Sequence, residues 1–240
     1  MSAGPLRLVL AGADPCLRDW MRAIVHARPQ LQLVGDVARG DEAIAVVADL
    51  APAVLLLDIE VTGASACSVT RAVLTRRPQL GIVVWIGVRD STELPELKAA
   101  ALQRAGASGC VDSAVDAQEL AHAVVCASVG TAYVSNRLRR RALLRATLTP
   151  REHEVLTLLA AGRTSAHIAR TIGIATATVS SHTARICQKV GLAGRAEAAA
   201  MGRDLGLGRD LEVTTDLAAY YAASHHRREA LARSDCARGR

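Results

Sequence analysis

Short aliphatic runs alternate with longer segments of helical period through the first half of this chain. The runs are LRLVLA (6–11), LQLVGD (31–36), AVLLLD (53–58), GIVVWI (81–86) and SGCVD (108–112). Short runs that are apolar throughout suit strands covered on both faces, as in a parallel sheet. Asp14 before Pro15 indicates a helix start, and Pro29 and Pro78 follow two helix ends. Five strand and helix units therefore predict an α/β fold with a doubly wound, five-stranded parallel sheet.

Asp58 ends the third of these runs. In a doubly wound sheet, ligands bind in the crevice outside the carboxyl ends of the central strands, so Asp58 is expected at that crevice. The order and length of the units, with the local matches LLLDIEVTG and RAGASGCV, resemble the receiver domain of bacterial response regulators across residues 5–128. The resemblance implies a receiver-like, flavodoxin-like domain over residues 1–128. It also implies that Asp58 stands at the phosphoacceptor position.

Four positions depart from the receiver pattern. A receiver needs an acidic pair after its first strand because Mg²⁺ takes hard oxygen ligands, and here Gly12 and Ala13 stand there. The lysine after the fifth strand and the Ser or Thr after the fourth, which contact the phosphoryl oxygens, are replaced by Ser113 and Ile86. One carboxylate cannot hold Mg²⁺ and organise phosphoryl transfer alone. We therefore expect an atypical receiver without cofactor or metal, in which Asp58 is not phosphorylated.

Two further carboxylates are close to this crevice in the sequence. Asp14 is expected to cap a helix, and Asp112, by strand alternation, is expected to point elsewhere. Asp58 is then interpreted as the remnant of a phosphorylation site. The less acidic crevice is also compatible with a small-molecule ligand or with a static dimer contact. The sequence does not choose between these interpretations.

The charge is divided unevenly between the two halves. Residues 1–130 carry a net charge of −3 and residues 131–240 a net charge of +9. Such asymmetry indicates a neutral or acidic module joined to one that meets a polyanion, although a solvated basic surface would give the same count.

Residues 129–147 are interpreted as a linker, part of which could form a short helix. Its arginines either contact phosphates beside a DNA site or form a solvated face; they are Arg137, Arg139, Arg140 and Arg141.

Helix signals become dense from residue 149 onward. In TPREHEVLTLLAAG, Thr149 as N-cap, Pro150 at the first helical position and Glu152 three residues after the cap form a capping box. Gly162 ends this helix. A second helix is predicted in TSAHIARTIGI (164–174) and a third in TATVSSHTARICQKVGL (176–192).

The second and third of these helices are joined at a glycine turn, and the third is amphipathic. That arrangement describes a helix-turn-helix whose second member can enter the major groove of DNA. The order of residues resembles the LuxR-type helix-turn-helix domain of the NarL/FixJ response regulators across residues 148–208. The resemblance implies DNA binding and a fourth helix, RAEAAAMGRDLGL, that supports dimerisation.

The outward face of the third helix carries the candidate DNA-binding residues. Hydroxyl groups bond phosphates or base edges, Arg forks onto guanine and Gln pairs with adenine. The candidates are Thr178, Ser180, Ser181, Arg185, Gln188 and Lys189. Family members often carry lysine at the position of Ser180 and some carry it at that of Ala184, and its absence here implies fewer phosphate contacts.

The remaining features exclude several classes of protein. The six cysteines show no zinc-site spacing, and no catalytic or metal-binding residues are assigned. No apolar run is long enough to span a bilayer, and the early first strand leaves no room for a signal peptide, so a cytoplasmic protein without membrane contact is expected. Residues 209–240 are interpreted as a C-terminal extension that is partly helical or disordered. Its adjacent His225 and His226 are poorly spaced for chelation.

Together these patterns predict a bacterial DNA-binding transcription regulator, not an enzyme, that works as a dimer and is controlled independently of phosphorylation. Its partner is a second copy of the chain or a related regulator. Two alternatives stay open: a heterodimerising subunit with weak DNA binding of its own, and a conventional phosphorylated response regulator. A flavin or nucleotide enzyme on the same sheet is disfavoured, because the first loop, AGADP, lacks a phosphate cradle.

Overall fold

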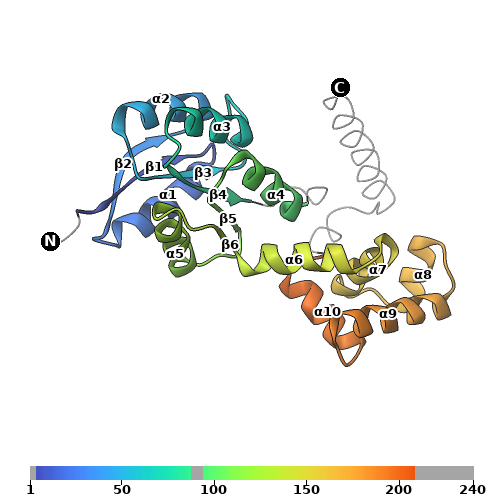
Figure 1. Cartoon of the computed structure of the whole chain (residues 1–240). Helices are drawn as coiled ribbons and strands as arrows, with labels where there is room; N and C mark the ends of the chain where they lie inside the picture. The colour runs from blue at the N-terminus through green and yellow to red at the C-terminus, as the bar shows by residue number, and fades with distance from the viewer. Residues whose placement is uncertain (1–3, 88–93, 209–240) are drawn as a thin grey trace, which may run out of the picture. The chain divides into compact units, whose positions relative to one another are not determined.

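The computed structural model describes residues 4–87 and 94–208 of the chain (Figure 1). The chain divides into two compact units, the first ending at Arg139 and the second beginning at Arg140. The predicted features of the C-terminal extension, including His225 and His226, lie outside the described residues.

The first unit is built on a parallel sheet whose strand order is β2-β1-β3-β4-β5-β6. The strands are β1 (Leu6–Ala11), β2 (Leu31–Val37), β3 (Val54–Asp58), β4 (Gly81–Ile86), β5 (Gly109–Asp112) and β6 (Tyr133–Val134). The predicted count of five strands is wrong, because β6 adds a sixth within residues 129–147. This strand is only two residues long and shows no period of its own. Backbone bonds from Tyr133 N to Ser108 O (2.8 Å) and from Ser135 N to Cys110 O (3.0 Å) attach it to β5.

Five helices cover the two faces of this sheet (Figure 1). They are α1 (Pro15–His26), α2 (Gly40–Leu50), α3 (Ala66–Arg76), α4 (Pro95–Ala105) and α5 (Ala117–Ser128). Strand alternation divides the core: Leu55 and Leu57 of β3 face a cluster with α2, α3 and α4, whereas Val54 and Leu56 face a cluster with α1 and α5. Each face buries aliphatic side chains, which confirms the doubly wound α/β fold.

The second unit is helical. It contains α7 (Pro150–Ala160), α8 (Ser165–Ile172), α9 (Thr176–Val190) and α10 (Arg195–Asp204), around a core that includes Val155, Leu156, Ile168, Val179 and Ile186. The predicted capping box is confirmed, because Glu152 N donates to Thr149 Oγ1 and Thr149 N donates to Glu152 Oε2. Gly173, with φ of 68°, adopts the left-handed conformation that ends α8 and turns the chain into α9.

One helix contributes side chains to both units. Helix α6 (Asn136–Thr147) fills most of the segment predicted as a linker. Its Leu138 is buried in the core of the first unit, whereas Leu144 is buried in the core of the second, beside Leu148. Among all the helices that the structure describes, none has both the length and the apolar character needed to cross a membrane.

Candidate functional site

The helix α9 separates a buried stripe from an exposed one. Val179 and Ile186 are fully buried, and Thr183 turns its hydroxyl back to Val179 O at 2.8 Å. On the opposite side, the exposed residues Thr178, Ser181, Arg185 and Gln188 recur three or four positions apart and so share one face. The sequence places these polar residues outward because the apolar residues of the same helix fix which side meets the core.

The two longest side chains of that face have no partner within the described structure. Neither Arg185 nor Gln188 makes a side-chain hydrogen bond or ion pair there, and both are exposed. Ser180 and Ser181 donate their hydroxyls to the carbonyls of Thr176 (3.4 Å) and Ala177 (3.1 Å), which leaves the hydroxyl oxygens able to accept. The face therefore offers a guanidinium fork, an amide and two hydroxyls to an outside partner.

Lys189 is placed differently from its neighbours. Its Nζ donates to Glu152 Oε2 over 2.7 Å and to Thr147 O over 3.4 Å. Burial acts to raise the pKa of Glu152, but bonds from Lys189 and from the Thr149 backbone outweigh it and hold that pKa below its ordinary value. Because Glu152 is only 3% exposed, the ammonium of Lys189 serves the fold of the second unit. We therefore leave Lys189 out of the face that is open to a partner.

A groove of about 500 Å³ adjoins the exposed face of α9. It is lined by Ser165, Ser180, Thr183, Ala184, Cys187, Gln188, Leu192, Ala193, Gly194 and Arg195. Arg195, at the start of α10, donates from Nη1 to Ser165 Oγ (2.9 Å) and from Nη2 to Arg163 O (2.6 Å). It thereby ties the start of α10 to the start of α8. This brace could not be predicted from local patterns, because its partners lie about thirty residues away along the chain.

The crevice of the first unit holds Asp58 and Gly12 side by side. Asp58 is 2% exposed, and its Oδ1 accepts a bond from Glu60 N at 3.1 Å. A Cβ atom on Gly12 would lie 3.1 Å from Asp58 Cβ, and 3.5 Å from both Asp58 Oδ2 and Arg18 Cγ. Arg18 also donates to Asp36 Oδ1 at 3.1 Å. An arginine therefore runs past the position where a receiver carries its acidic pair.

The acids beside this crevice have structural partners. Asp14 caps α1 by accepting from Cys16 N at 2.9 Å, as predicted. Asp112, which is 4% exposed, accepts from Ser135 Oγ and from Ala114 N, both at 2.8 Å, and lies 3.6 Å from Arg137 Nη1. Asp112 is thus turned toward the start of α6.

The two remaining receiver positions are Ser113 and Ile86. Ser113 is exposed, whereas Ile86 is fully buried among the apolar residues that pack under α2, α3 and α4. Neither residue offers a cation or a buried hydroxyl to a phosphoryl group. Within residues 4–87 and 94–208, no three His, Cys, Asp or Glu side chains converge in a way that could hold a metal ion.

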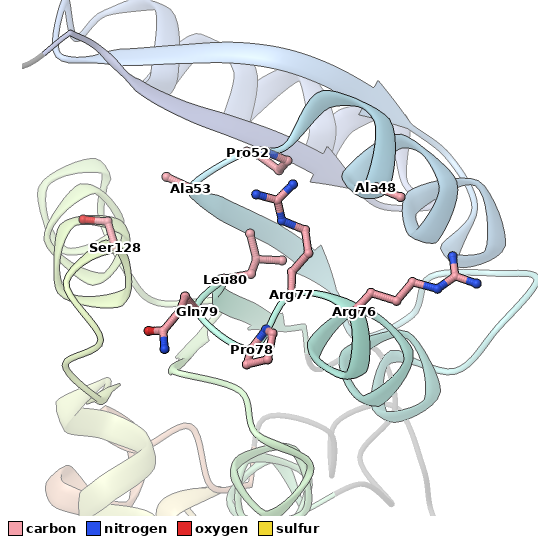
Figure 2. Close-up of a pocket in the computed structure, with 9 residues that line it drawn as sticks. All are labelled: Ala48, Pro52, Ala53, Arg76, Arg77, Pro78, Gln79, Leu80 and Ser128. Atoms are coloured by element: carbon pink, nitrogen blue, oxygen red, sulfur yellow. The ribbon is translucent and has the colours of Figure 1, made fainter.

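A second hollow, of about 630 Å³, lies at the opposite edge of the sheet (Figure 2). Its lining residues are Ala48, Pro52, Ala53, Arg76, Arg77, Pro78, Gln79, Leu80 and Ser128. Helix α3 ends at Arg76 with Arg77 as its C-cap, while Leu50 and Ser128 end α2 and α5. Helix carboxyl ends carry partial negative charge, which nearby guanidinium groups stabilise. This accounts for both arginines without a ligand.

Comparison with known proteins places the second unit in a family. Residues 146–202 match the model of bacterial regulatory proteins of the luxR family. The transcriptional regulatory protein LiaR of Bacillus subtilis is 27% identical over 206 residues, which cover 81% of this chain and 95% of LiaR. The nitrate/nitrite response regulator NarL of Escherichia coli K12 is 29% identical over 207 residues, which cover 81% of this chain and 94% of NarL. Both relatives are regulators by name.

Solved structures share the fold of the chain. The response regulator ChrA of a heme-sensing two-component system has a TM-score of 0.50 at 24% identity and covers 85% of this chain and 100% of ChrA. The regulator RcsB in a complex with DNA has a TM-score of 0.51 at 20% identity and covers 81% of this chain and 96% of RcsB. A second RcsB structure holds two dimers bound to two parallel DNAs.

Proposed function

Because this chain is a response regulator of the NarL/LuxR type, with a receiver domain followed by a LuxR-type helix-turn-helix domain, we propose that it binds DNA as a dimer and acts independently of phosphorylation. Helix α9 is the recognition helix of this proposal. In this proposal the receiver domain is a structural and contact module, and phosphorylation does not switch it.

The observation that carries the DNA-binding part is the exposed face of α9. Arg185 and Gln188 are exposed and have no partner among the described residues, so neither has to break an internal bond before it meets a base edge. A guanidinium matches the two acceptors of guanine, and an amide matches the donor and acceptor of adenine. RcsB, which shares the fold, binds DNA as dimers, and this supports a dimer here as well.

The phosphorylation-independent part is supported by the contact between Gly12 and Asp58. Glycine supplies no oxygen to a metal, and the side chain of Arg18 occupies the neighbouring space. Mg²⁺ offsets the charge of an incoming phosphoryl group only when several oxygen ligands hold it. Ala13 adds none, and Ser113 stands where a receiver uses lysine. Both the acidic pair and the lysine that a receiver uses for phosphoryl transfer are therefore replaced in this chain.

DNA binding is tested by fluorescence anisotropy with labelled DNA from the region upstream of the chain's own gene. Arg185→Ala removes one bidentate contact and is expected to weaken binding about tenfold or more. The matched control is Arg104→Ala, which removes an exposed arginine from α4 of the receiver and is expected to leave affinity unchanged. An absence of binding by the wild-type chain alone, restored by a second regulator, would favour the heterodimerising subunit instead.

Phosphorylation independence is tested with acetyl phosphate and Mg²⁺. The expected result is no stoichiometric label on the wild-type chain, and equal DNA affinity for wild type and Asp58→Ala. If the chain is labelled stoichiometrically, and if Asp58→Ala removes both the label and a rise in DNA affinity, the chain is a conventional response regulator. Binding of DNA would survive that outcome, so the two parts of the proposal fail separately.

A further inference from the structure

The helix α5 carries a histidine and a cysteine whose side chains lie against each other. His122 Nε2 and Cys126 Sγ are 3.5 Å apart, one helical turn from each other on the exposed side of the receiver. The ring of His122 stands edge-on to Tyr133, with centroids 5.4 Å apart and planes at 82°. Tyr133 is in turn fixed by a 2.7 Å bond from its hydroxyl to Glu119 Oε1. The imidazole is therefore held by its surroundings beside the thiol.

The separation of the two atoms suits a metal ion. Zinc bonds of about 2.3 Å to sulfur and about 2.0 Å to nitrogen, at a tetrahedral angle, place the two ligand atoms about 3.5 Å apart. We propose that His122 and Cys126 form half of a tetrahedral site for zinc or a similar thiophilic divalent ion, and that a second copy of the chain completes the site with the same two residues.

The coordination number requires the second copy. No third His, Cys, Asp or Glu converges on this pair within residues 4–87 and 94–208. The nearest acid on the same helix, Glu119, accepts the hydroxyl of Tyr133. A tetrahedral site takes four ligands, and a two-fold axis beside α5 brings two identical His and Cys pairs to one ion. The resulting site has two nitrogen and two sulfur ligands, a combination that zinc sites use.

The surface around the pair is suited to contact with another copy. Val125 is 51% exposed and lies three residues from His122, so it shares its side of α5, and the C-cap residue Val129, at the end of the helix, is 72% exposed. The surface of His122, Val125, Cys126 and the C-cap residue Val129 thus combines exposed apolar side chains with two metal ligands. When α5 pairs with its symmetry mate, the valines cover each other and the ligands meet. The inference does not depend on DNA binding.

The test is a titration of the reduced full chain with Co²⁺, which reports tetrahedral thiolate coordination by visible absorption. We expect intense ligand-field bands that saturate near one ion per two chains, together with a doubling of mass in sedimentation when Co²⁺ or Zn²⁺ is added. Cys126→Ser and His122→Ala are each expected to weaken cobalt binding by about tenfold or more and to keep the chain at its metal-free mass.

Two controls isolate the pair. Cys16→Ser removes an exposed cysteine on α1 and is expected to titrate like the wild type. A His225→Ala, His226→Ala background excludes the adjacent histidines of the C-terminal extension as ligands. The proposal is wrong if the bands are absent, if they persist in Cys126→Ser, or if the ion binds at one per chain without a change in mass. Circular dichroism of each variant establishes that a lost signal does not come from unfolding.

Discussion

Lys189 donates from its ammonium group to the buried carboxylate of Glu152 over 2.7 Å. The pair joins the last turn of α9 to the cap of α7, because Glu152 also closes the capping box with Thr149. A charged contact between residues 37 positions apart therefore joins the buried apolar residues in holding α9 in place. Lys189 and Arg185 stand on the same helix, yet one serves the fold and the other faces outward.

Substitution of Lys189 should lower the stability of the fold, whereas substitution of Arg185 should not. Lys189→Met leaves the carboxylate of Glu152 buried without its cation, and the side chain of Lys189 is 36% exposed, so the expected loss is about 1–3 kcal/mol in the free energy of unfolding. Arg185→Ala should leave that free energy unchanged. Urea unfolding followed by circular dichroism measures both. Equal stability of the two variants would contradict the structural role of Lys189.

Acid should weaken the second unit through Glu152. The pKa of this carboxyl is held below its ordinary value of 4.5 in the folded chain, so the folded state favours the ionised form. The stabilisation is thus present above the pKa of the unfolded chain and is lost as the pH falls through the lowered folded pKa. Glu152→Gln should flatten this dependence in urea midpoints measured across acidic pH. A slope in Glu152→Gln equal to that of the wild type would contradict this role of Glu152.

Restoring an acidic pair should restore magnesium binding. Trp85 is the register partner of Asp58 and contacts Trp20 with ring centroids 4.9 Å apart, so tryptophan fluorescence reports on the crevice. The wild-type chain should show no change on addition of MgCl₂. Gly12→Asp combined with Ala13→Asp should give a saturable change, since oxygen ligands then stand at both positions of the receiver's acidic pair. A saturable response of the wild type would overturn the account of the crevice given above.

Close packing of α10 on α7 predicts a cost for a single methyl group. A Cβ atom on Gly202 would lie 2.7 Å from the Cβ of Ala160, a distance at which one helix must move. Gly202→Ala should therefore lower the free energy of unfolding by about 1–3 kcal/mol. Gly194→Ala is the matched change at a position with nothing within 4 Å, and it should be close to neutral. Thermal unfolding that gives the same midpoint for both would refute the packing argument.

Local patterns predicted most of the fold. Runs of aliphatic residues mark β3 and β4 most clearly, because every residue of these two strands is buried and a strand covered on both faces has no need of polar positions. The capping box of Thr149 and Glu152 is visible because its partners are three residues apart. Strand β6 could not be predicted in this way: two residues carry no period, and only the exposed edge of β5 makes Tyr133 and Val134 a strand.

The candidate site was predicted as far as one helix allows. The apolar stripe of α9 shows that Arg185 and Gln188 face outward, since both exposures follow from helical spacing. The same spacing does not show that Lys189 reaches Glu152, because that bond depends on how two helices pack. The brace from Arg195 to Ser165 and the pairing of Cys126 with His122 were missed for related reasons. Two side chains that meet only when the chain folds cannot be paired from the sequence. The same holds for two residues one helical turn apart when their spacing matches no known motif.

Helix α6 determines where the chain can be cut. Leu144 and Leu148 are buried with the DNA-binding helices, although they precede the capping box, and Leu138 is buried with the receiver. A fragment that began at Thr149 would lose two core side chains, and one that began before Asn136 would expose Leu138 to water. The practical start for an isolated DNA-binding fragment is therefore within α6, between Leu138 and Leu144, where a protease that nicks the native chain would leave both cores whole.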